Sequence, residues 1–134
     1  MGNISMKELL HQAPYNADAR AEACPPTDEM LANANLLIRR VNALLQHWSD
    51  KVTVSSGYRP PSYNKAAKGA SNSSHMTCEA VDIRDPDNKL DQFISENNWL
   101  LVKYALYREH PEATKGWVHL TTRPPISGNR TFRP

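Results

Sequence analysis

One long amphipathic segment constrains the fold of this chain more than any other feature. Thr27 comes before Asp28 and Glu29, which is typical of a helix N-cap followed by an acidic first turn. From Met30 to Trp48 apolar residues recur at steps of three and four, which predicts a helix of about 20 residues with a single apolar stripe. Because a stripe of that length must be buried, we expect the helix to pack on a sheet.

Strands are expected in four places. Their composition or alternation is typical of strands in residues 51–55, 79–84, 100–107 and 117–121. In the second segment Val81 and Ile83 face one side and Asp82 faces the other. In the last segment His119 shares a face with Trp117. An aspartate and a histidine therefore each lie inside a predicted strand.

The remaining segments predict shorter elements. Three short helices are predicted, at residues 6–12, 62–67 and 88–98. The rest of residues 1–26 is predicted to be irregular, and residues 123–134, rich in Pro, Gly and Arg, to form a tail that wraps the surface. A chain of 134 residues fits one domain. We therefore predict a single α+β domain, residues 1–134, in which a small mixed or antiparallel sheet packs against the long N-terminal helix.

The charge and hydropathy of the chain argue against two classes of partner. The net charge is +2 at pH 7, and the basic residues are scattered rather than gathered in a stripe, so no nucleic-acid partner is predicted. No stretch approaches the roughly 20 apolar residues that cross a bilayer, and no apolar signal sequence follows Met1. We therefore expect a monomeric protein that is made in the cytoplasm.

The two cysteines, Cys24 and Cys78, are too few for a disulfide framework. We expect both to be reduced thiols. Cys78 lies between His75 and Asp82, two candidate metal ligands, so it is either a small buried side chain or a further ligand.

Three side chains offer the donor atoms of a catalytic zinc site. His75 and Asp82 are seven residues apart, where a loop is predicted to lead into a strand, and His119 lies 37 residues beyond Asp82. Three nitrogen or oxygen ligands with one open position are typical of catalytic zinc. Spacing alone leaves alternatives, because His119 also suits a hydrogen-bonded core histidine and Asp82 an ion pair with Arg59 or Arg84.

Four sequence blocks in a fixed order carry more information than any one of them. They are Ser-Gly-Tyr-Arg-Pro-Pro at 56–61, Asn-Ser-Ser-His at 72–75, Ala-Val-Asp-Ile at 80–83 and Trp-Val-His at 117–119. Together they resemble the M15-type zinc peptidases, a family that includes D-Ala-D-Ala carboxypeptidases and phage endolysin peptidases and shares its fold with the Hedgehog signalling domain. The resemblance covers residues 27–125, most of the chain.

The resemblance implies one zinc ion per chain, bound by His75, Asp82 and His119. It implies that Arg59 lies in the substrate cleft, where a guanidinium suits a peptide carboxylate, and that Ser73 lies near the metal loop. From the residues alone, Arg59 also suits a structural ion pair and Ser73 a turn-forming hydroxyl. The implied substrate is a peptidoglycan stem peptide with D-amino acids.

The chain departs from the family pattern in two places. Cys78 stands where the family usually has Gly, so this residue is strained if its position requires a positive φ. Many relatives carry a catalytic Glu or His just before the last ligand, but residues 116–118 here are Gly, Trp and Val, and none can move a proton. We predict Glu109 as the general base and Glu112 as the second candidate.

These features together predict a zinc metallopeptidase, either a carboxypeptidase or an endopeptidase, that degrades the cell wall. We expect a phage or bacterial lytic enzyme that reaches the wall after release or export by another factor. Tyr58 and Trp117 are expected to line its cleft. The alternative is a zinc-binding module or virion component without hydrolytic activity, which the missing acid or base beside His119 favours.

Overall fold

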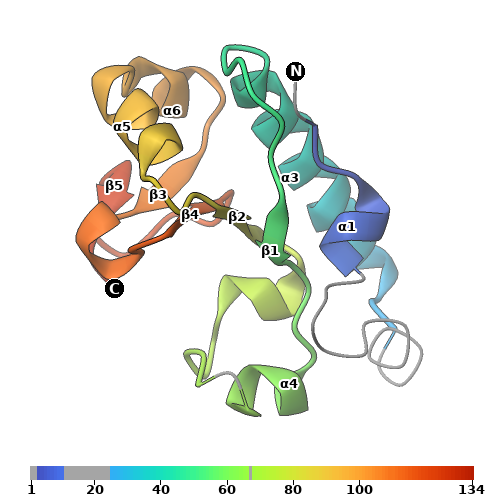
Figure 1. The fold of residues 1–134 in the computed structure, drawn as a ribbon. Coiled ribbons are helices and arrows are strands. Elements are labelled where there is room, and N and C mark those ends of the chain that lie inside the picture. The colour runs from blue at the N-terminus through green and yellow to red at the C-terminus, as the bar shows by residue number, and fades with distance from the viewer. Residues whose placement is uncertain (1–2, 11–24, 67) are drawn as a thin grey trace.

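The fold is α+β, with most helices on one side of a five-stranded mixed sheet and the short helix at residues 61–66 on the other (Figure 1). The computed structural model describes residues 3–10, 25–66 and 68–134. The predicted Cys24 thiol and most of the predicted irregular segment lie outside the described residues, as do residues 11 and 12 of the first predicted helix. Within the described part of the chain, no helix is long and apolar enough to cross a membrane.

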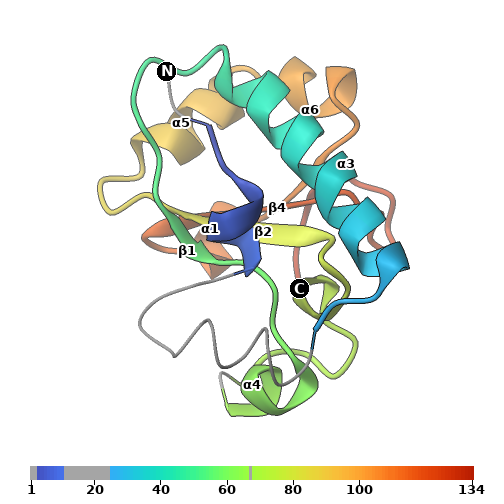
Figure 2. The same cartoon turned by 90° about the vertical axis from the view of Figure 1, so that its right-hand side faces the viewer.

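The long predicted helix is present as α3, Asp28–Leu45. The Thr27 side chain accepts a hydrogen bond from the Met30 amide, as the N-cap pattern predicts. Its apolar stripe is buried in the same hydrophobic core as Val81 and Ile83 of the sheet. In Figure 2 α3 lies over the sheet, so the amphipathic pattern is satisfied as predicted.

The sheet has the strand order β1-β2-β4-β3-β5. The strands are β1 Val54–Ser56, β2 Ala80–Arg84, β3 Tyr107–Glu109, β4 Trp117–Thr121 and β5 Thr131–Phe132. All neighbours pair antiparallel except β3 and β5, which pair parallel. Val81, Ile83, Val118 and Leu120 point into the helical core, so alternate residues of β2 and β4 are free to build a site on the opposite face.

Shorter helices surround this frame. They are α1 Met6–Leu10, α4 Pro61–Ala66, α5 Lys89–Glu96 and α6 Trp99–Lys103, with 3₁₀ turns η1 Ser74–Thr77 and η2 Pro111–Ala113. The first turn of α5 is capped by Asp85, whose carboxylate accepts hydrogen bonds from the amides of Leu90 and Asp91 at 3.0 and 2.9 Å. Asn88 itself makes no capping hydrogen bond with its side chain.

Two of the predicted segments are corrected by the structure. Residues 100–107 are not mainly a strand, because residues 100–103 belong to α6 and only Tyr107 belongs to β3. A short apolar run fits either element, and here Leu100 and Leu101 are buried while Val102 is exposed. The predicted surface tail, residues 123–134, also contributes β5 to the sheet and a wall to a cleft of about 950 Å³.

Candidate metal centre and catalytic cleft

Strand pairing brings Asp82 and His119 together. In the antiparallel ladder of β2 and β4, Asp82 lies directly opposite His119, so both side chains project from the same face of the sheet. The Nδ1 atom of His119 is 2.8 Å from Oδ1 of Asp82. Two residues that are 37 positions apart in sequence thus become neighbours through backbone register alone.

His75 reaches the same point from the turn η1, just before β2. The Ser73 hydroxyl caps this turn by accepting a hydrogen bond from the His75 amide at 3.2 Å. Cys78 ends the turn in the left-handed conformation, with φ of 60°. The Nδ1 atom of His75 lies 2.9 Å from the carbonyl oxygen of Gly57. The Nε2 atom faces Asp82, whose Oδ1 is 3.3 Å away; a neutral imidazole that donates through Nδ1 to the Gly57 carbonyl would offer its Nε2 lone pair to a metal bound there.

The three side chains fit a zinc ion. Among the residues that the structure describes, His75, Asp82 and His119 form a group whose ligand atoms all lie within 4.8 Å of one another. Ligands about 2 Å from a tetrahedral zinc lie roughly 3.3 Å apart, close to the separations from Asp82 of 2.8 and 3.3 Å. Two imidazoles and one carboxylate leave the fourth position open, which suits a catalytic rather than a structural site.

The electrostatics keep Asp82 in its ligating form. Burial favours the neutral acid, but the charge of His75 and hydrogen bonds with His119 and His75 outweigh burial and hold the pKa of Asp82 well below its ordinary value. A metal ligand must be deprotonated, so this carboxylate is ready to bind. Cys78 is different, because burial, with the charge of Glu79, raises the pKa of its thiol to about 12. Its side chain belongs to the hydrophobic core, in line with a small buried residue rather than a ligand.

Glu109 faces the three candidate ligands from the next strand. It ends β3, which pairs with β4, and its Oε2 atom is 4.0 Å from Nδ1 of His119. Burial raises the pKa of the Glu109 carboxyl above its ordinary value; the nearby His119 opposes this rise and Asp82 adds to it. Glu112 lies outside the cleft, with 70% of its side chain exposed and an ion pair to Arg133 at 3.1 Å.

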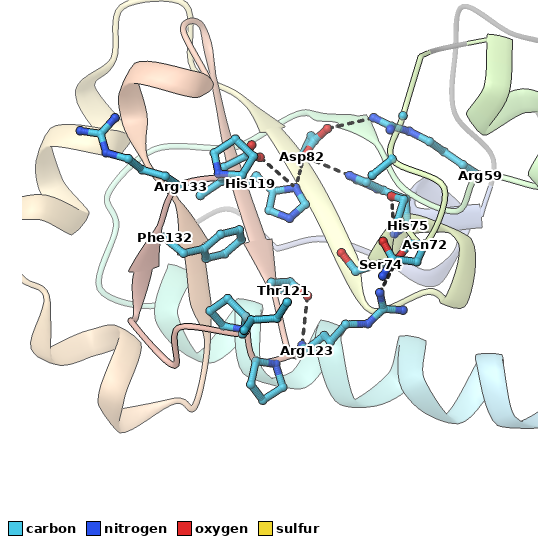
Figure 3. Close-up of a pocket in the computed structure, with 18 of the residues that line it drawn as sticks. Arg59, Asn72, Ser74, His75, Asp82, His119, Thr121, Arg123, Phe132 and Arg133 are labelled. Carbon is cyan, nitrogen blue, oxygen red and sulfur yellow. Dashed lines mark hydrogen bonds and ion pairs between the residues drawn. The ribbon is translucent and has the colours of Figure 1, made fainter.

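The cleft of about 950 Å³ is lined by His75, Asp82, Glu109 and His119 (Figure 3). Arg59 lies at one side of it, where its guanidinium contacts Oδ2 of Asp82 at 3.3 Å and donates to the Ser56 hydroxyl at 2.9 Å. Trp117 and Ser73 also line the cleft.

A family comparison agrees with this geometry. Residues 4–121 match the family model described as peptidase M15. The chain belongs to the peptidase M15 family. No curated protein matches the chain. The family assignment makes this M15 chain a peptidase, and its candidate metal ligands are the three residues that the four sequence blocks pointed to.

One predicted cleft residue of this M15 peptidase lies elsewhere. Tyr58 is only 2% exposed and belongs to the hydrophobic core. It follows Gly57, where the chain passes so close to α1 that the Tyr58 amide donates to the Leu9 carbonyl at 2.7 Å. The Tyr58 side chain therefore belongs to the core rather than to the lining of the cleft.

Two residues of the cleft escaped prediction because the tail of the M15 peptidase was assigned to the surface. The Phe132 ring meets the His119 ring edge to face, with centroids 6.2 Å apart, and Figure 3 shows it near this candidate ligand. Arg123 lies at the other end of the cleft and contacts the loop that carries His75. Neither belongs to a sequence pattern, and only the position of Arg123 just after the last predicted strand offered a clue.

Proposed function

We propose that this chain is a zinc peptidase that hydrolyses amide bonds in peptidoglycan stem peptides. The observation that carries the proposal is the meeting of His75, Asp82, His119 and Glu109 in one cleft. A zinc site of this kind needs three ligands, an open position and a nearby base. Three donor side chains and a nearby carboxylate support this proposal, and the family supplies the reaction class.

His75, Asp82 and His119 would hold the zinc ion, with the Gly57 carbonyl fixing the orientation of the His75 ring. Zinc bound there would supply Lewis acidity, both to acidify a water molecule and to polarise the scissile carbonyl. The other side chains of the cleft would then have two roles, which are to move protons and to orient the peptide.

Glu109 is the residue that moves the proton in this proposal. Its carboxylate takes a proton from the attacking water and then delivers it to the leaving amine. The raised pKa suits this role, because a more basic carboxylate holds the proton long enough to pass it on. Glu109 therefore replaces the acid or base that residues 116–118 lack.

Arg59 orients the substrate in this proposal. Its guanidinium lines the cleft beside Asp82, and it offers several N–H donors in a planar fork that matches a carboxylate. A stem peptide carries carboxylates, so Arg59 is placed to bind one of them while the scissile amide lies near the metal centre. The same proposal makes the protein a phage or bacterial lytic enzyme that another factor brings to the wall.

The test is mass spectrometry of purified peptidoglycan after incubation with the zinc-loaded protein, with a chelated sample beside it. New amine and carboxyl termini that disappear with the chelator are the expected result, and their masses identify the bond. The Glu109→Gln variant should lose about 10²- to 10⁴-fold in rate while still binding zinc. Glu112→Gln is the matched control, since this carboxylate lies outside the cleft, and it should keep full activity.

The outcomes separate an enzyme from a binding module. If folded, zinc-loaded protein yields no new termini, the chain acts as a zinc-binding module and the hydrolytic proposal is overturned. If wild-type protein is active and Glu109→Gln remains equally active, the reaction stands but the base assignment is wrong.

A further inference from the structure

Arg123 lies two residues beyond the segment that matches the family, just after β4. Its guanidinium turns back toward the loop at residues 72–79, as Figure 3 shows. It donates to the Asn72 carbonyl, to the Thr77 hydroxyl at 2.7 Å, and through two nitrogens to Oε1 of Glu79 at 3.0 and 3.2 Å. One side chain thus holds three residues that are 44 to 51 positions away in sequence.

The loop that Arg123 holds carries the one candidate ligand that lies outside the paired strands β2 and β4. Asp82 and His119 are fixed by the register of β2 and β4. His75 is on a single 3₁₀ turn that follows exposed residues at 70–72. Its distance to the other two ligands therefore depends on where this turn lies relative to the sheet.

The contacts of Arg123 act at that point. His119 lies in the middle of β4 and Arg123 two residues beyond its end, whereas Thr77 and Asn72 flank His75 on the loop. A second link supports the same connection, because the Thr121 hydroxyl donates to the Glu79 carbonyl at 2.8 Å and accepts from the Arg123 amide at 3.0 Å. The network joins the strand that carries one ligand to the loop that carries another.

We propose that Arg123 is a positioning residue that sets the distance between His75 and the Asp82–His119 pair. The inference rests on the proposed metal site and assigns to the segment after β4 a part in building it. A guanidinium suits this role because it is planar, always charged and able to donate several hydrogen bonds at once. The Arg123–Glu79 pair is only partly exposed, at 33% and 23%, so solvent screens it less than a surface pair.

The experiment measures zinc affinity by competition with a chromophoric chelator, and thermal stability of the same proteins in excess chelator. Arg123→Met should weaken zinc binding about 10- to 100-fold, the range for losing a residue that orients a ligand. Arg123→Lys should fall between Arg123→Met and wild type, because one ammonium cannot serve all three acceptors at once.

Arg130→Met is the matched control. Arg130 belongs to the same C-terminal segment, donates to the Leu106 carbonyl at 3.2 Å and stacks over Tyr107 at 4.4 Å, so these interactions lie on β3 and its approach rather than on the loop at residues 72–79. Its variant should bind zinc within about 2-fold of wild type. If Arg123→Met keeps the affinity of wild type, or if Arg130→Met weakens binding equally, the positioning role is refuted.

A Glu79 variant and the zinc affinity of wild-type protein cover the remaining outcomes. If Arg123→Met does not fold, Glu79→Gln removes the charge of the partner and should weaken zinc binding by a smaller factor, about 3- to 10-fold; unchanged affinity in that variant also refutes the proposal. If wild-type protein itself binds no zinc, the proposed function fails, which is a separate result from an unchanged affinity in the variants.

Discussion

The backbone of Cys78 offers a sharp test of the turn that carries His75. Cys78 has φ of 60° and a fully buried side chain. A residue with a Cβ atom is strained by roughly 1–2 kcal/mol in this left-handed conformation, whereas Gly is not. Replacing Cys78 by Ala keeps this strain, and replacing it by Gly removes it, so the difference between the two variants isolates the backbone term.

The expected difference follows from three contributions. Gly at position 78 relieves roughly 1–2 kcal/mol of strain relative to Ala. It also loses about 0.8 kcal/mol of methyl burial and about 0.5–1 kcal/mol through the greater freedom of the unfolded chain. These contributions nearly cancel, so Cys78→Gly and Cys78→Ala should have free energies of unfolding within about 0.5 kcal/mol of each other.

Ala80 supplies the control two residues away. It is fully buried in the extended strand β2, where no strain is relieved, so Ala80→Gly should cost about 1.5 kcal/mol from the same two losses. Guanidinium unfolding in excess chelator and reductant measures all three variants, provided that their m-values agree. If Cys78→Gly is less stable than Cys78→Ala by the Ala80→Gly amount, the argument for strain at Cys78 is refuted.

Three more predictions concern the metal centre and its base. In Gly57→Ala the new Cβ would lie 2.1 Å from the Leu9 carbonyl oxygen, so we expect a loss of about 1–3 kcal/mol in stability. Zinc binding should weaken about 10- to 100-fold, because the Gly57 carbonyl that holds His75 would shift. Unchanged zinc affinity in chelator competition would contradict this. In metal-free protein, the raised pKa of Glu109 means that the folded state holds this proton more tightly than the unfolded state. The stabilisation from protonated Glu109 is then complete below the pKa of the unfolded state and is lost as pH rises through the pKa of the folded state. Calorimetry should therefore show Glu109→Gln to be more stable than wild type at pH 8, and the difference in stability should decrease toward pH 4. A gap that widens on acidification would show that the sign is wrong. Finally, acid should release zinc because protons compete with the metal for imidazole nitrogens, and zinc content that stays constant from pH 7 to pH 4 by atomic absorption would argue against two histidine ligands.

The elements with a strong period were predictable from the sequence. The helix α3 has a single apolar stripe over 18 residues, and a stripe of that length indicates a helix buried along one face. Asp82 and His119 were predictable as strand residues because alternation fixes their faces. Their direct opposition in the ladder was not predictable, since register depends on pairing between distant segments.

Residues held by contacts with distant segments were the hardest to predict. Leu100 and Leu101 fit a strand as well as a helix, because a run of a few apolar residues has no measurable period. Arg123 and Phe132 contact the metal loop and His119 across long sequence separations. Such hydrogen bonds and ring contacts leave no periodic trace in the sequence.

The register of β2 and β4 decides whether the proposed metal centre can form. A slip of one residue between these strands would turn either Asp82 or His119 to the helical side of the sheet and destroy the ligand pair at once. A slip of two residues would keep both side chains on one face but move them from opposite to diagonal positions, about 7–8 Å apart, so neither slip keeps the 2.8 Å contact between His119 and Asp82. A metal that binds only the correct alignment lowers the free energy of that state alone, so zinc added during refolding would act as a selector among strand pairings.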